Sequence, residues 1–192
     1  CCPPNIARTL ASLGQYIYSV AKDEVYMNMF VENKTTFFLN NQEVILEQQT
    51  KYPFQNTANI SCDSKEENEF TLAIRIPSWC MGAKVKVDGE NIDVNENLNK
   101  GYLYIKKVWH GISKIEVAFD MPAQLIEANP KVRAGAGKLA IVKGPLVYCL
   151  EEIDNGENLS AIQIAPNAQL TESFEPELLG GILVIRANAK RI

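Results

Sequence analysis

The clearest strand signal in this 192-residue chain is Phe70-Thr71-Leu72-Ala73-Ile74-Arg75-Ile76-Pro77. Its large apolar side chains recur at every second position, which is the period of a strand that buries one face. Pro77 lacks the backbone N–H that a sheet ladder uses, so we expect the strand to end there. The segment therefore predicts a half-buried β-strand near the middle of a sheet-rich chain.

Further strand patterns flank this segment at intervals of about 8–12 residues, with turn signals between them. They cover residues 25–31, 36–39, 44–50, 59–62, 85–87, 92–94, 103–105 and 115–119. Asn40-Asn41 and Asp88-Gly89 are typical of tight turns, and the charged run 65–69 is interpreted as a solvated turn. This spacing predicts a mainly β protein, with an antiparallel β-sandwich domain over residues 23–125.

The last third of the chain carries weaker strand patterns at 139–142, 146–150, 162–164 and 182–185. They are too few for a complete sandwich of their own. We therefore expect residues 126–192 to form a partial second β domain, or to complete the first one.

A different period precedes the strands. Apolar residues spaced by three and four positions predict an amphipathic helix over residues 4–21; they are Ile6, Leu10, Leu13, Ile17 and Val20. No second helix of this kind follows in the chain. We therefore interpret residues 1–22 as the last helix of a helical domain that precedes this sequence, with an apolar face that either docks on the sandwich or stays exposed.

The composition excludes several classes of protein. Hydrophobic residues make up 46% and charged residues 22%, the balance of a globular chain. The net charge of −4 argues against a nucleic-acid partner, and the lack of an apolar run of about 18 residues argues against a membrane span. Cysteines at 1, 2, 62, 80 and 149 show no disulfide framework, which favours a reducing, cytoplasmic location. The sequence leaves open whether the protein forms an oligomer.

Cys1-Cys2-Pro3-Pro4-Asn5 concentrates the chemistry of the chain. Three interpretations remain open for the cysteine pair: small buried packing residues, a vicinal disulfide, or a functional pair that serves as nucleophile or metal ligand. The position before a predicted helix favours the third, because the positive end of a helix stabilises thiolates. Two thiolates do not complete a zinc site, which takes four ligands, so others would have to come from elsewhere.

The remaining reactive or aromatic residues are interpreted more simply. His110, the single histidine, is expected in a surface turn, and Cys62, Cys80 and Cys149 are expected to pack. Trp79 and Trp109 are expected to pack too, although tryptophans on a β-sandwich can also stack against sugars.

The pentapeptide resembles the Cys-Cys-Pro-Pro-Asn signature of glycoside hydrolase family 127, the β-L-arabinofuranosidases. The resemblance continues through Gly14-Gln15-Tyr16-Ile17-Tyr18 and resumes at Phe70 to Trp79. It resumes again at Gly101-Tyr102-Leu103 with Trp109, and at Gly144-Pro145-Leu146-Val147-Tyr148. It therefore covers residues 1 to about 150.

This resemblance implies an (α/α)6 barrel followed by β-sandwich domains, with residues 1–22 as the barrel's final helix. It also implies that Cys1 is the catalytic nucleophile at the anomeric carbon and that Cys1 and Cys2 are zinc ligands. A glutamate and a third cysteine from a Glu-x-Cys motif would complete the zinc site, and a separate glutamate would be the general acid/base.

Those glutamates and that cysteine have no counterpart in this sequence, because the family places them upstream of the signature. We therefore expect this chain by itself to retain zinc poorly and to be inactive on an L-arabinofuranose-containing glycan. The alternative is a non-catalytic β-sandwich module that binds carbohydrate or serves assembly.

Overall fold

A computed structural model describes residues 2–192 and divides the chain into two compact units. The N-terminal unit ends at Asp120, and the C-terminal unit is Met121–Ile192. The sequence-based boundary at residue 125 falls inside the first strand of the C-terminal unit, β10 (Ala123–Glu127).

The fold is mainly β, as predicted. The helical elements are short: α1 (Cys2–Ser12), the 3-10 helix η1 (Leu13–Tyr16), α2 (Val94–Asn97), η2 (Arg133–Gly135), α3 (Glu152–Asn155) and η3 (Leu159–Ala161). The N-terminal unit contains β1 (Tyr18–Ala21), β2 (Glu24–Met27), β3 (Asn33–Leu39), β4 (Gln42–Thr50), β5 (Thr57–Arg75), β6 (Ala83–Val87), β7 (Glu90–Ile92), β8 (Leu98–Asn99) and β9 (Tyr102–Phe119).

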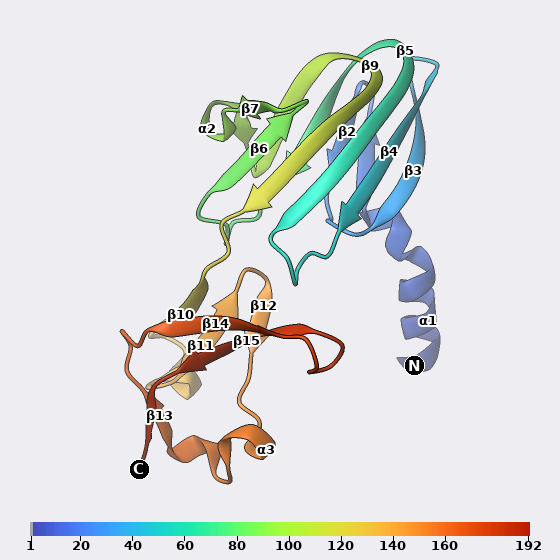
Figure 1. The fold of residues 1–192 in the computed structure, drawn as a ribbon. Helices are drawn as coiled ribbons and strands as arrows, with labels where there is room; N and C mark the ends of the chain where they lie inside the picture. The colour runs from blue at the N-terminus through green and yellow to red at the C-terminus, as the bar shows by residue number, and fades with distance from the viewer. Residues whose placement is uncertain (1) are drawn as a thin grey trace. The chain divides into compact units, whose positions relative to one another are not determined.

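Two long antiparallel strands, β5 and β9, organise the N-terminal unit (Figure 1). The start of β5 pairs with β4 while the end of β9 pairs with β6, and with β3 and β7 these strands form what we call layer A. The end of β5 pairs with β2 while the start of β9 pairs with β8, and with β1 these strands form layer B. The β2–β5 pairing is parallel, which departs from the all-antiparallel prediction.

A β-bulge in the β5/β9 ribbon separates the two layers. The register shifts between Ser64 and Asn68, opposite Gly111 and Trp109. Bulges increase the local bend and twist of a ribbon, so one pair of strands can serve both layers. Asn68 is buried at the bulge, where its amide nitrogen donates to the Leu39 carbonyl and its amide oxygen accepts from Asn40.

The core lies between the layers. Tyr18 of β1 contacts Phe37 of β3 edge to face at 5.1 Å, and its hydroxyl accepts from the buried amide of Gln48 in β4. Trp109 is fully buried, stacks on Phe70 at 5.4 Å and donates its ring N–H to the Phe70 carbonyl. The contacts of Tyr18 join layer B to layer A, so the N-terminal unit is the predicted β-sandwich.

The C-terminal unit consists of small separate sheets. Its strands after β10 are β11 (Leu139–Lys143), β12 (Leu146–Tyr148), β13 (Ile162–Ile164), β14 (Leu170–Glu175), β15 (Ile182–Ala187) and β16 (Ala189–Arg191). The sheets are β10-β11-β12, β13-β16 and β14-β15. Met121 and Ala161 are the buried hydrophobic residues that the described part of this unit contains.

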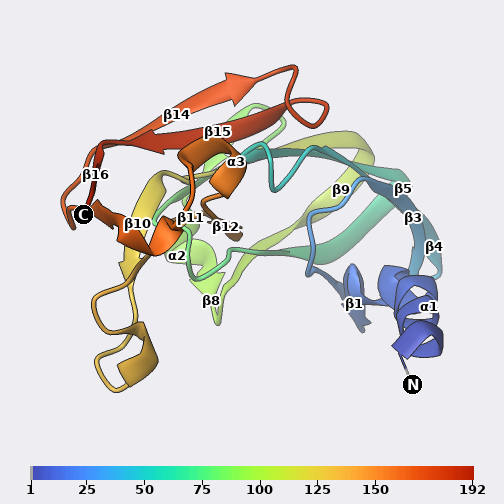
Figure 2. The ribbon, with the colours of Figure 1, turned by 90° about the horizontal axis from the view of Figure 1, so that it is seen from below.

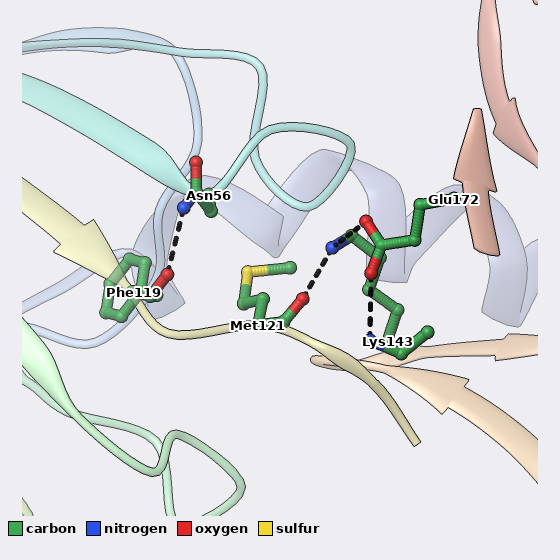
Figure 3. A network of polar contacts seen from close by, with 6 residues as sticks. Asn56, Phe119, Met121, Lys143 and Glu172 are labelled. Atoms are coloured by element: carbon green, nitrogen blue, oxygen red, sulfur yellow. Dashed lines mark hydrogen bonds and ion pairs between the residues drawn. The ribbon is translucent and has the colours of Figure 1, made fainter. Parts of the chain in front are cut away.

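One polar network holds the first strands of the C-terminal unit to β14 (Figure 3). The Lys143 ammonium donates to the Met121 carbonyl and forms an ion pair of 2.8 Å with Glu172. The second oxygen of Glu172 accepts from the Ala123 N–H at 2.9 Å. Figure 3 also shows Asn56 donating to the Phe119 carbonyl within the N-terminal unit.

The predicted helix 4–21 is wrong in its second half. The α-helix ends at Ser12, and residues 18–21 form β1, which pairs with β2. The spacing of Ile17 and Val20 fits a helix, but Tyr18 and Val20 also fit the two-residue period of a strand, and pairing with Met27 and Val25 prevails. Strand β2 is also shorter than predicted, because it ends at Met27.

Three predicted turns can now be compared with the structure. Asn40-Asn41 and Asp88-Gly89 are tight turns, and all four residues have positive φ. The charged run 65–69 is not a turn: it belongs to β5 and contains the bulge. Its charged residues are exposed, so the prediction of a solvated segment is confirmed. The prediction that the chain reverses there is wrong.

Across residues 2–192, no helix has both the length and the hydrophobicity that crossing a bilayer would require.

Candidate functional site

The cysteine pair stands at the start of α1. Cys1 lies outside the described residues. Cys2 is the first residue of α1 and is exposed. The structure thus places Cys2 where the sequence predicts it, at the beginning of a helix.

The apolar face of α1 is exposed in the described chain. Ile6 is 60% and Leu10 68% exposed, and α1 has no buried residue. Figure 2 shows α1 at the edge of the N-terminal unit. Of the two predicted outcomes for this face, docking on the sandwich or exposure, the structure has the second. The helix is held internally, since Arg8 donates to the Asn5 side chain at 2.6 Å and Thr9 to the Asn5 carbonyl at 2.8 Å.

Cysteine, histidine and carboxylate side chains do not gather into a zinc site within residues 2–192. No three such residues lie close enough there to hold a metal ion together. Adjacent thiolates suit zinc chemically, but a structural or catalytic zinc site needs at least three protein ligands. The donors of the described chain therefore do not fit a complete zinc centre.

The other thiols have distinct environments. Cys62 is fully buried in β5, and burial raises the pKa of its thiol to about 12, so it stays protonated and unreactive. Cys80 is half-buried, and its thiol donates to the Gly82 carbonyl. The packing prediction is confirmed for Cys62 and is wrong for Cys149, which is exposed after β12.

Two further predictions concern ring side chains. His110 is exposed, as expected, but it lies within β9 next to the bulge and not in a turn. Trp109 is fully buried and therefore packs. Trp79 is half-buried and contacts the rings of Tyr52 and Phe119, which confirms a packing role.

A cluster of tyrosines on the outer side of layer B was not predicted. Its members, which we call the tyrosine face, are Tyr26 of β2 and Tyr102 and Tyr104 of β9. The ring of Tyr26 meets those of Tyr102 and Tyr104 edge to face, at centroid distances of 5.3 and 6.1 Å. The sequence does carry a signal for it, because these tyrosines occupy the outward positions of strands whose alternate residues are apolar.

Hydrogen bonds fix the tyrosine face. The Tyr26 hydroxyl donates to the Glu24 carboxylate, and the Tyr102 hydroxyl donates to the Asn28 side chain at 2.8 Å. The pKa of Tyr26 is raised well above its ordinary value, first because of the bond to Glu24 and next because of a bond with Tyr104. The Tyr26 hydroxyl therefore remains protonated over the physiological pH range and keeps its bond to Glu24.

Comparisons with protein families account for nearly the whole chain. The family model for "Beta-L-arabinofuranosidase, GH127 middle domain" matches residues 24–121. The model for "Glycoside hydrolase family 127 C-terminal domain" matches residues 123–186. The two matches meet close to the division between the two compact units.

Individual relatives match this chain over its full length. A curated non-reducing end beta-L-arabinofuranosidase of Bifidobacterium longum subsp. longum is 30% identical, and the match covers all of this chain and 30% of that protein. A crystal structure of a GH127 beta-L-arabinofuranosidase from Geobacillus stearothermophilus T6 matches with a TM-score of 0.94 and 42% identity, again over 100% and 30% of the two chains. A solved GH127 beta-arabinofuranosidase matches with a TM-score of 0.92 and 33% identity, over 100% and 32%. The chain therefore spans about a third of the length of these relatives.

Proposed function

Because the chain belongs to glycoside hydrolase family 127, we propose that it is the C-terminal part of an enzyme that releases L-arabinose from β-L-arabinofuranosides. The observation that carries this proposal is the match, over the full length of this chain, to proteins that bear the name beta-L-arabinofuranosidase. The catalytic barrel would precede the chain, with α1 as its last helix.

Cys1 is the proposed nucleophile. Its thiolate sulfur would form a bond to the anomeric carbon as the bond from that carbon to the leaving oxygen breaks. A glutamate outside this sequence would give its proton to that oxygen, and would then take a proton from the water that releases the sugar from sulfur. Two displacements at one carbon retain its configuration. The exposure of the neighbouring Cys2 at the start of α1 supports this role, because it leaves the motif open to a substrate.

Cys1 and Cys2 are also the proposed zinc ligands of the complete enzyme, together with a glutamate and a third cysteine from outside this sequence. When bound, the metal would keep its cysteine ligands deprotonated at neutral pH. Since no three potential ligands gather within residues 2–192, we propose that this chain alone holds zinc poorly and does not hydrolyse the substrate.

The test compares the 192-residue chain with a longer protein that includes it and a Glu-x-Cys motif. Both are assayed with an aryl β-L-arabinofuranoside, and their zinc content is measured by mass spectrometry. We expect activity and bound zinc in the longer protein only. Hydrolysis by the 192-residue chain would refute the proposal of a divided site.

Matched variants of the longer protein separate the thiols. Cys1→Ser should abolish turnover, and Cys2→Ser should lower both zinc content and activity. Cys149→Ser is the control, since Cys149 is an exposed cysteine in the C-terminal unit, and it should change neither. Full activity of Cys1→Ser would exclude Cys1 as the nucleophile.

The alternative, a non-catalytic module that binds carbohydrate or serves assembly, loses one of its candidate platforms, because Trp109 is fully buried. Sugar binding by this chain would need another aromatic surface.

A further inference from the structure

The tyrosine face lies on the outer side of layer B. Val25 and Met27 flank Tyr26 in β2 and are completely buried, so Tyr26 points the other way, out of the core. In β9, Leu103 is likewise buried between Tyr102 and Tyr104. Three aromatic rings thus stand on a sheet surface that does not contribute to the sandwich core.

The strand register places the small side chain of Ala73 between Tyr26 and Tyr104. In layer B, Tyr26 pairs with Ala73 of β5, and Ala73 pairs with Tyr104 of β9. Ala73 points outward, yet it is completely buried, because the rings on either side cover it. The rings are therefore packed against the sheet and against each other, and little entropy is lost when a ligand contacts them.

Polar groups border the rings on two sides. Glu24 accepts from Tyr26, and Asn28 accepts from Tyr102, which sets the direction of both hydroxyls. Arg75 pairs with Tyr102 across the strands and is exposed; its contact is a long bond of 3.5 Å to the Asn28 carbonyl. The face thus combines aromatic rings with a carboxylate, hydroxyls and a guanidinium.

This combination selects one kind of occupant. Beside the rings, the outward positions of β2, of residues 71–75 in β5 and of residues 102–106 in β9 hold no large aliphatic residue. The half-exposed Val108 lies further along β9. Glu24 and Arg75 have opposite charges, so the face favours neither an anion nor a cation. Aromatic rings for the apolar faces of a sugar, bordered by fixed donors and acceptors for its hydroxyls, match a neutral glycan.

We propose that the tyrosine face is a glycan-binding surface that binds neutral pentofuranosyl chains. The inference rests on the proposed function only for the choice of sugar. It assigns a role to Tyr26, Tyr102 and Tyr104 that hydrolysis at Cys1 does not require.

The test is an NMR titration of the 192-residue protein with neutral arabinan oligosaccharides, with malto-oligosaccharides as the comparison sugar. We expect amide shifts that centre on residues 26, 73 and 102–104, and weaker binding of the maltose series. Shifts centred elsewhere, or no shifts at millimolar sugar, would overturn the proposal in the unaltered protein, without reliance on a variant.

Variants then test the rings. Tyr104→Ala should weaken binding at least about fivefold, since an aromatic contact contributes on this scale, while Tyr104→Phe should stay within about twofold. Phe38→Ala is the control, because Phe38 is an exposed aromatic residue in layer A and is 75% accessible. Equal losses in Tyr104→Ala and Phe38→Ala would refute the assignment.

Light scattering tests the competing occupant of the face, a second copy of the protein. A concentration-dependent dimer that Tyr104→Ala disrupts would identify the face as a contact between protein copies and would refute the glycan assignment. Hydrolysis of the small aryl arabinofuranoside by the longer protein is scored separately. If the unaltered protein does not bind the glycan while the longer protein turns over the aryl substrate, this inference is contradicted and the proposed function is not.

Discussion

The two compact units of this chain are stabilised by different kinds of contact. In the N-terminal unit, one bent ribbon supplies strands to two layers, and their apolar faces meet in a continuous core. In the C-terminal unit, three small sheets share two buried hydrophobic residues among those described, Met121 and Ala161. Lys143 and Glu172 add a polar clamp there.

This difference predicts where each unit is vulnerable. Apolar burial gives the N-terminal unit stability that is distributed over many side chains, so only a large loss in its core should matter. The C-terminal unit depends on few contacts, so single changes at its clamp or its turns should open it locally. The comparison can be tested with matched substitutions in each unit.

The largest effect is expected from Trp109→Ala. It removes the stacked contact with Phe70, a buried hydrogen bond and the largest buried side chain of the core. Truncation of a buried aromatic residue costs about 3–5 kcal/mol of the free energy of unfolding. Urea denaturation followed by circular dichroism measures the loss. The neighbouring Val108→Ala, at a half-exposed position, should cost less than about 1 kcal/mol; equal losses would contradict the role of the core.

Gly144→Ala should give the next largest loss, this time in the C-terminal unit. Gly144 has a φ of +55°, and an added Cβ would lie 2.6 Å from the terminal methyl of Met121. We expect a loss of about 2–3 kcal/mol from backbone strain together with displacement of Met121.

Gly137→Ala is the matched control for that change. Its φ is also positive, +71°, but its Cβ would meet no atom within 4 Å, so only the backbone cost of about 1 kcal/mol remains. Thermal unfolding of both variants measures the difference. If Gly137→Ala costs as much as Gly144→Ala, contact with Met121 is unimportant.

Glu172→Gln should loosen the clamp of the C-terminal unit. It removes the charge that pairs with Lys143, whose side chain is 13% exposed. A hydrogen bond to a charged group contributes about 1.5–3 kcal/mol, and partial exposure of Glu172 places the expected loss near the lower end. Hydrogen exchange at the Ala123 amide reports the opening, and Glu177→Gln, an exposed position two residues after β14, is the control. Unchanged protection at Ala123 would contradict a stabilising role.

The smallest effect concerns pH and the β6–β7 turn. Partial burial would raise the pKa of Asp88, but a bond from the Lys114 N–H and bonds and charge from Lys107 and Ser113 outweigh it, so the pKa is lowered below 3.8. Ionised Asp88 therefore stabilises the fold above the unfolded pKa, and this contribution is lost as the pH falls through the folded pKa.

Because the Asp88 side chain is 43% exposed, the effect should be below about 1 kcal/mol. The difference in unfolding free energy between the unaltered protein and Asp88→Asn should be present at pH 7 and shrink toward pH 3. A difference that does not depend on pH would show that the charge of Asp88 is irrelevant.

The sequence predicts the alternation of β2, β4 and the end of β5 because buried and exposed residues follow each other there with period two. It does not predict the bulge at Ser64–Asn68, since exposed charges on a bent strand have the same pattern as a solvated turn. The prediction that His110 lies in a turn is wrong for the same reason, because His110 is in β9 opposite that bulge. The parallel β2–β5 pair depends on contacts between residues 24–27 and 71–74, which local patterns do not encode.

The candidate site divides in the same manner. The motif around Cys1 and Cys2 predicts a nucleophile and metal ligands by residue type and by resemblance, and the structure adds only the helix that Cys2 begins. The tyrosine face was hidden from sequence reasoning because its three residues come from two strands 76 positions apart, from Tyr26 to Tyr102. Only the register through Ala73 brings them together.

The β5/β9 ribbon also has a consequence for synthesis on the ribosome. Its innermost pair is Arg75 with Tyr102 and its outermost is Thr57 with Ala118, so the ribbon can close progressively as the chain emerges. All strands of the sandwich have been translated once Phe119 has left the exit tunnel. Since domains fold as units during translation, the sandwich can be complete before the C-terminal unit has been synthesised.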